Sequence, residues 1–241
     1  MSEKCFCGSG KKKKKCHPYV IKNSKLADIY LAYQNFDKKV YKEHIAASCP
    51  NDCCECCYDF FFISENEFLT ILDYLMVQGN YQIFMEKAKN YADFIKKHYP
   101  NIHKDIDCYM ETMNNENFDA KYFNDNYFWK RDIPCIFLKN GKCAIYEVRP
   151  AVCRGYGVCQ YCSKINNNLN ILKEQDRMIE TTTYIKNETT RILKRAYPIY
   201  YFFSYFLSDK YFKTTLIKLN YIRNLTEKEY ADFCEKLSEI K

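Results

Sequence analysis

Apolar residues recur at spacings of three and four over most of this chain, which is the pattern of amphipathic helices. Between Asn23 and about Ser48 the apolar positions are Leu26, Ile29, Tyr30, Tyr33, Val40 and Tyr41. Similar patterns follow Ser64 and Asn80, and residues 168–240 return to a helical pattern. The sequence therefore predicts a mainly helical fold.

Two central helices carry signals for where they begin and end. Ser64 and Glu67 have the spacing of a capping box, in which each side chain satisfies a free backbone amide of the first turn. Gly79 is expected to end that helix. Asn80 is expected to cap the next helix, which should end before Pro100.

The pattern is weaker in the middle of the chain and clear again near its end. Residues 101–132 are mixed and are expected to be loosely helical. Pro198 should begin an aromatic helix, and Thr226 with Glu229 should cap the last helix. Cys234 stands alone inside that last helix, where packing in the core is its expected role.

One short segment has the pattern of a β-hairpin. Asn140 and Gly141 lie between two short apolar arms, and both residue types tolerate the positive φ angles of a two-residue type I′ turn. The hairpin register places Cys143 opposite Leu138, and Cys135 falls just before the first strand. The turn should therefore position Cys143 rigidly and place Cys135 at its root.

Composition places the chain among globular proteins of the cytoplasm. Its 241 residues are 47% hydrophobic, which is enough to bury one sizeable core. No secretion signal and no apolar run of roughly 18 residues is visible in the sequence, so a cytoplasmic protein without a membrane span is expected. Fifteen cysteines in a reducing compartment favour metal ligation over disulfide bonds.

Residues 1–18 are predicted to form a small zinc-binding segment. Cys5, Cys7, Cys16 and His17 supply three thiolates and an imidazole, the set that structural zinc sites use. The stretch CFCGSGKKKKKCH resembles the SEC-C motif, a short zinc-binding tail, at every ligand position. The alternative is a disordered basic tail whose cysteines are incidental.

Five consecutive lysines lie between these expected ligands. A metal would hold Lys11 to Lys15 on a rigid loop, where their charge suits an acidic protein surface or the phosphate backbone of ribosomal RNA. A solvated loop without a partner is the alternative. The rest of the chain is nearly balanced in charge, so sequence-specific DNA binding is not expected.

A larger set of cysteines is predicted to converge from residues 49–57 and 135–162. The expected ligands are Cys49, Cys53, Cys56, Cys57, Cys135, Cys143, Cys153 and Cys159. Cys54 and Cys162 are further candidates. Four thiolates satisfy one zinc ion or one iron–sulfur cluster, so this number indicates two centres or a polynuclear one.

These stretches and the sequence IYEVRPAVCR resemble the YkgJ-type family, described as a zinc- or iron-chelating domain. The resemblance covers residues 49–160 within an expected helical domain of residues 23–241. Cys54 is an extra thiol relative to the family pattern, and the last ligand is left open between Cys159 and Cys162. Arg149 and Arg154 are expected to compensate buried thiolate charge, with binding of an anionic substrate group as the alternative.

Several functions are compatible with this cysteine pattern. A metal-binding protein active in protein interaction or modification is the leading prediction, and a purely structural metal is the simplest version of it. The resemblance extends to flagellin lysine N-methylases and implies S-adenosylmethionine-dependent methyl transfer, although no glycine-rich nucleotide loop is present in the sequence. An iron–sulfur redox protein is the third possibility. Catalytic and cofactor-binding residues remain unassigned.

Overall fold

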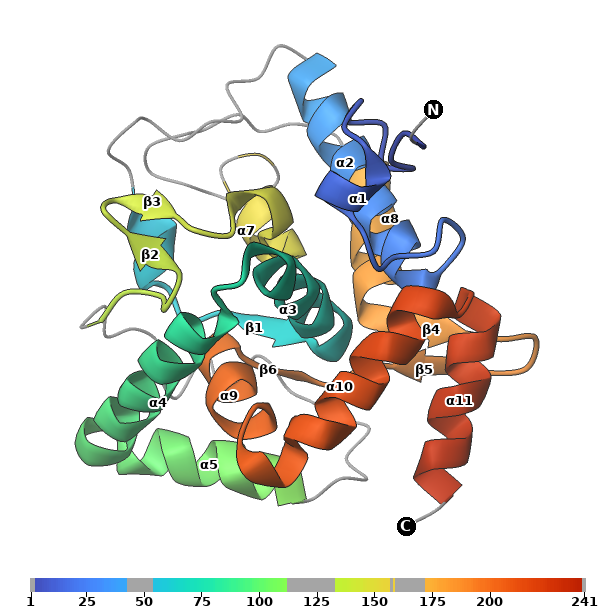
Figure 1. Cartoon of the computed structure of the whole chain (residues 1–241). Helices are drawn as coiled ribbons and strands as arrows, with labels where there is room; N and C mark the ends of the chain where they lie inside the picture. Colours follow the sequence, from blue (N-terminus) through green and yellow to red (C-terminus); the bar gives the residue numbers. More distant parts are fainter. Residues whose placement is uncertain (1–2, 43–53, 112–132, 157, 159–171, 240–241) are drawn as a thin grey trace.

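The computed structural model describes residues 3–42, 54–111, 133–156, 158 and 172–239 and is mainly helical (Figure 1). None of the described helices has the length and apolar composition needed to cross a lipid bilayer. The α-helices are α1 (Lys13–Cys16), α2 (Lys25–Lys42), α3 (Glu65–Gln78), α4 (Tyr81–His98), α5 (Pro100–Glu111), α7 (Ala151–Gly155), α8 (Leu172–Thr183), α9 (Ile199–Tyr201), α10 (Asp209–Asn224) and α11 (Glu227–Glu239). Single turns of other helix types are η1 (Glu55–Tyr58), η2 (Tyr146–Val148) and the π-helix η3 (Phe202–Phe206).

Three pairs of short antiparallel strands complete the described part of the chain. They are β1 (Phe62–Ser64) with β6 (Ala196–Pro198), β2 (Leu138–Lys139) with β3 (Lys142–Cys143), and β4 (Tyr184–Lys186) with β5 (Arg191–Leu193). In the first pair Ile63 lies opposite Tyr197, which joins segments far apart in the sequence. This pair sets the position of α3, which follows β1 directly.

The predicted hairpin is confirmed, with Leu138 opposite Cys143. Asn140 and Gly141 have φ angles of 52° and 73°, as a type I′ turn requires. Next to the first strand, the buried ring of Phe137 packs edge-on against Phe203, with centroids 5.2 Å apart. The hairpin and its cysteines are therefore anchored to the aromatic core.

The core is centred on α3 and on the aromatic segment of α9 and η3. The Phe68 ring stacks on Phe202 at 4.7 Å and meets Phe203 edge-on at 5.1 Å. These three side chains are almost completely buried, and burial of such large apolar surfaces is the main stabilising contribution in a fold of this kind. The predicted aromatic helix after Pro198 is thus part of the core.

The start of α2 is fastened to the turn between α10 and α11. The Ile21 amide donates to the Arg223 carbonyl at 2.9 Å, and the Lys25 amide donates to the Leu225 carbonyl at 2.8 Å. The buried Lys25 ammonium lies 2.7 Å from the Glu227 carboxylate. These contacts hold the N-terminal segment against the last two helices, and α2 continues alongside α8 (Figure 1).

Both predicted capping boxes are present. The Ser64 hydroxyl accepts from the Glu67 amide, and the Glu67 carboxylate accepts from the Ser64 amide. Thr226 and Glu229 make the same reciprocal contacts at the start of α11. Gly79 ends α3 with a φ angle of 70°.

Other predictions about the elements need correction. The helical prediction for residues 168–240 missed β4, β5 and β6, because strands of three residues are too short to produce a recognisable alternation. Asn80 precedes α4, but its side chain makes no capping hydrogen bond. The helix after Asn80 does end before Pro100 as predicted, at His98, but Pro100 also begins a further helix, α5, which agrees with the tolerance of proline in a first turn.

Candidate metal centre

The N-terminal segment folds back on itself before α1. The Cys5 amide donates to the Lys11 carbonyl at 2.9 Å, and Lys4 pairs with Lys12 in an antiparallel bridge. Gly8 and Gly10 have φ angles of 72° and 75°, which allow the intervening turn without steric cost. This turn brings the first two cysteines to the end of α1, where the other two expected ligands lie.

Cys5, Cys7, Cys16 and His17, which we call the N-terminal site, present four donor atoms within 4.8 Å of one another. The Cys7 and Cys16 sulfurs are 3.6 Å apart, and the Cys5 sulfur is 3.1 Å from His17 Nδ1. In a zinc tetrahedron with Zn–S bonds of about 2.3 Å, the sulfurs are about 3.8 Å apart. The four donors therefore already have nearly the separation that one metal ion requires.

Burial makes this site unfavourable for negative charge unless a cation is present. Burial raises the pKa of Cys5 and raises that of Cys16 to about 12. Burial also opposes ionisation of Cys7, but hydrogen bonding with Ser9 outweighs it and lowers the pKa of Cys7. Burial lowers the pKa of His17 and so favours the neutral imidazole that binds metals. A divalent cation would supply the charge that three thiolates need.

The N-terminal site is attached to the helical body through His17. Its ring lies 4.0 Å from the Tyr30 ring of α2 and 5.2 Å from Phe6. Tyr30 is itself buried, and its hydroxyl donates to Asp73 of α3 at 2.7 Å. Occupation of the site would therefore order residues 3–18 directly on α2.

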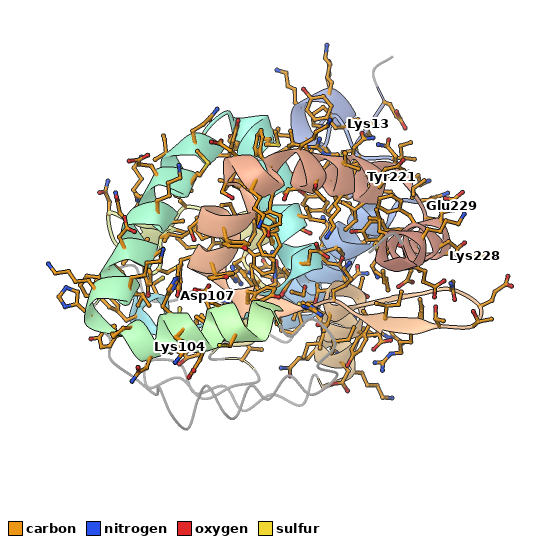
Figure 2. The ribbon with its side chains drawn as sticks, turned by 90° about the horizontal axis from the view of Figure 1, so that it is seen from below. Lys13, Lys104, Asp107, Tyr221, Lys228 and Glu229 are labelled. Atoms are coloured by element: carbon orange, nitrogen blue, oxygen red, sulfur yellow. The ribbon has the colours of Figure 1, made fainter. Side chains whose placement is uncertain are left out.

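The lysine run lies on the outer side of this segment. Lys11, Lys12, Lys14 and Lys15 are exposed. Lys13, labelled in Figure 2, lies 3.9 Å from the Glu3 carboxylate. Four ammonium groups therefore face solvent on a stretch whose two ends carry the metal ligands.

Five of the cysteines expected in the larger set come from four different elements. Cys56 and Cys57 lie in η1, Cys135 precedes β2, Cys143 lies in β3 and Cys153 lies in α7. The Cys135 amide donates to the Cys57 carbonyl, which joins η1 to the root of the hairpin. We call these five residues the central thiol group.

The five sulfurs influence one another electrostatically. A hydrogen bond with Cys56 and burial raise the pKa of Cys57, and the same hydrogen bond lowers that of Cys56. The pKa of Cys135 is raised to about 12, mainly by burial and in smaller part by Cys143 and Cys56. Burial also raises the pKa of Cys153, with contributions from Cys135, Cys56 and Cys143. The two distant stretches therefore meet in the fold.

The central thiol group is less compact than the N-terminal site. Within the described ranges, the N-terminal site alone has three or more Cys, His, Asp or Glu donor atoms as close as 4.8 Å. Cys49, Cys53, Cys159 and Cys162, which the sequence also nominates, lie outside the described residues. Cys54 is half-buried at the start of η1.

Arg154 holds the segment that carries Cys153. Its side chain is completely buried and pairs with Asp37 of α2. It also donates to the carbonyls of Arg149, at 2.9 Å, and Glu147, and its guanidinium lies 4.2 Å from the centre of the Tyr33 ring. These contacts fix α7 against α2 and η2.

Arg149 contributes electrostatically to the pKa values of two thiols in the central thiol group. A hydrogen bond with Cys57 lowers the pKa of Cys56, and Arg149 adds to that effect. Burial raises the pKa of Cys143, and Arg149 only partly offsets the rise. Its guanidinium lies 3.7 Å from Asp37 and 3.9 Å from the centre of the Tyr146 ring. Arg149 thus favours thiolate at Cys56 and Cys143, and Arg154 acts in the same direction on Cys143.

Ser9 was not among the residues nominated from the sequence. Its hydroxyl lies 3.2 Å from the Cys7 sulfur and 3.5 Å from the Cys16 sulfur, so it can stabilise two of the ligands. The sequence contains a clue to this role, because Ser9 stands between the two turn glycines of CGSG. Serine is a common turn residue, which concealed the second role.

His44, His98 and His103 lack paired ligand spacing in the sequence and are not expected to bind metal. His98 is exposed at the end of α4, and His103 of α5 lies 3.1 Å from Asp107. His44 lies outside the described residues.

Comparison of the chain with known protein families, curated proteins and solved structures found no match. The SEC-C and YkgJ resemblances therefore remain predictions from the quoted residues.

Proposed function

We propose that this chain binds zinc through Cys5, Cys7, Cys16 and His17. The observation that carries the proposal is the convergence of four donor atoms within 4.8 Å, from residues that a turn and a short helix bring together. Three sulfurs and one imidazole nitrogen form the ligand set of structural zinc sites. The ion would neutralise thiolates whose burial is otherwise unfavourable.

Metal loading is expected to give about one Zn²⁺ per N-terminal site, and Co²⁺ substitution should give the visible spectrum of a tetrahedral thiolate complex. The measurement is elemental analysis of anaerobically purified protein together with an absorption spectrum. Cys108→Ser, which changes an exposed cysteine of α5, is the matched control. A Co²⁺ spectrum that the change of Cys5, Cys7 and Cys16 to serine leaves unaltered would contradict the proposal.

The central thiol group supports a second metal centre as part of the same function. Cys56, Cys57, Cys135, Cys143 and Cys153 supply more thiols than one tetrahedral ion needs, and their mutual repulsion as thiolates would favour a cation among them. The anaerobic spectrum distinguishes the two metals, because an iron–sulfur centre is coloured and zinc is not. Nothing among the described residues adds to the sequence resemblance to flagellin lysine N-methylases.

The metal-bound N-terminal segment is proposed to bind an anionic partner, either an acidic protein surface or ribosomal RNA. Lys11 and Lys12 of the preceding turn and Lys14 and Lys15 of α1 are exposed on a segment whose ends would be fixed by the metal. A metal that orders this segment in advance reduces the loss of conformational entropy when the four lysine side chains bind a partner. Metal binding and partner binding should therefore be coupled.

Replacing the four exposed lysines with glutamine is expected to weaken ribosome co-sedimentation of the zinc-loaded protein by about tenfold or more at low salt. Lys96→Gln with Lys97→Gln, on the exposed face of α4, controls for a general loss of positive charge. Equal sedimentation of both variants would argue against the four lysines of the N-terminal segment as the binding surface. Failure of the wild type to sediment would instead direct the search to acidic proteins.

A further inference from the structure

Cys234 lies outside both cysteine groups and has an unusual neighbour. The Lys194 ammonium nitrogen is 3.6 Å from its sulfur. Cys234 is half-buried on α11, and Tyr230 lies one helical turn earlier with its ring centre 5.7 Å from the same ammonium group. The sequence-based expectation of simple core packing does not account for a lysine at this position.

The charged groups around Lys194 leave one positive charge unmatched. Glu65 of α3 pairs with Lys194 at 2.6 Å and also with Lys218 of α10. Burial opposes ionisation of Glu65, but the two lysines lower its pKa overall; burial likewise opposes the charge on Lys194, but Glu65 raises its pKa overall. Two ammonium groups therefore share one carboxylate. An anion at Cys234 would complete the charge balance of this group.

A buried hydroxyl group faces the same sulfur. Among the described residues, Tyr230 Oη is buried without a hydrogen-bond partner. Burial raises the pKa of Tyr230, and the nearby sulfur of Cys234 raises it further, so the hydroxyl keeps its proton. A buried donor without an acceptor is unfavourable, and an oxygen atom bound to the Cys234 sulfur would offer an acceptor.

We propose that Cys234 is a site of reversible oxidation by hydrogen peroxide. The thiolate sulfur attacks one peroxide oxygen, an S–O bond forms as the O–O bond breaks, and the departing hydroxide takes up a proton to become water. The sulfur loses two electrons, the peroxide gains them, and the product is cysteine sulfenic acid. Lys194 stabilises the attacking thiolate, and Tyr230 donates to the oxygen of the product.

This reaction fits the partial exposure of the site. A reactive cysteine needs a nearby cation and access for a small oxidant, and Cys234 has both because it is only half-buried beside Lys194. Cys108 offers an internal comparison, since it is exposed on α5 next to Asp107. Figure 2 shows Asp107 of α5 well separated from Lys228 and Glu229 of α11, so the two cysteines report on different surfaces.

The test is site-specific trapping of sulfenic acid with dimedone in the full-length, zinc-loaded protein after brief exposure to hydrogen peroxide. Peptide mass spectrometry would compare labelling of Cys234 and Cys108. Cys234 is expected to react at least about tenfold faster than Cys108 because of the adjacent ammonium group. Lys194→Met should remove most of that advantage, and Glu65 would keep Lys218 as its partner in the variant.

Two milder variants cover the possibility that Lys194→Met does not fold. Lys194→Arg keeps the charge and should retain fast labelling, whereas Tyr230→Phe removes only the hydroxyl and should shorten the lifetime of the sulfenic acid. Faster labelling at Cys234 that depends on the charge at position 194 supports the proposal. Labelling of Cys234 no faster than Cys108, or fast labelling unchanged by both Lys194→Met and Tyr230→Phe, would overturn it.

Discussion

Cys16→Ser is expected to lower the affinity of the N-terminal site for Zn²⁺ by about a hundred- to a thousandfold. Structural zinc binding is worth roughly 10–16 kcal/mol, so an equal share for each of four ligands is about 2.5–4 kcal/mol. Competition with a chromophoric chelator measures the affinity. The Cys16 sulfur lies 3.6 Å from that of Cys7, so serine at this position removes a ligand from the centre of the set.

The same substitution should leave the helical body folded. The core around Phe68 and Phe202 makes no use of the metal ligands, so far-ultraviolet circular dichroism is expected to be nearly unchanged. Proteolysis should become faster at the lysines of α1, because this segment would no longer be held by the metal. Cys108→Ser is the control for loss of a thiol in general. Unchanged affinity in Cys16→Ser would remove this residue from the ligand set.

Arg154→Met is expected to destabilise the protein by about 1–3 kcal/mol, mainly because it leaves backbone carbonyls without a donor, whereas the side chain of Asp37 is 45% exposed and can be hydrated. The substitution would leave Asp37 without its closest partner and the carbonyls of Arg149 and Glu147 without donors. Urea denaturation followed by circular dichroism measures the change in the free energy of unfolding. A neighbouring Arg149 at 3.7 Å from Asp37 can recover only part of the loss.

Arg177→Met provides the matched comparison for that experiment. Arg177 is an exposed arginine of α8, so its replacement should change the free energy of unfolding by less than about 0.5 kcal/mol. Arg154→Met should additionally weaken metal binding by the central thiol group, since Arg154 fixes the turn that carries Cys153. Equal stability of the two variants would show that the buried contacts of Arg154 contribute little.

Features encoded by neighbouring residues could be predicted from the sequence. The four donor residues of the N-terminal site lie within the 13 residues from Cys5 to His17, and the Asn140–Gly141 turn determines the hairpin without help from the rest of the chain. The capping boxes at Ser64 and Thr226 are equally local. In each case the interacting residues are close enough in sequence for spacing alone to define their geometry.

Features that depend on distant segments were not predictable in the same way. The pairing of β1 with β6 involves three residues on each side, too few to leave a periodic pattern. The partner of Arg154 is Asp37, which lies on a helix that gives no sign of the contact. The same limit applies to Lys194 and Cys234, which meet only because α11 packs on the segment before β6. Tertiary packing selects these pairs.

The different sequence spans of the two cysteine groups imply an order of events during synthesis. The N-terminal site is complete once His17 has left the ribosome, whereas the central thiol group needs both Cys56 and Cys153. Strand β1, which follows η1, can form its pair only after β6 has been synthesised, which happens later still. If the N-terminal site binds zinc as proposed, a nascent chain would acquire that ion long before its core closes, while the cysteines of η1 would stay accessible to other ions and to oxidation until translation is nearly finished.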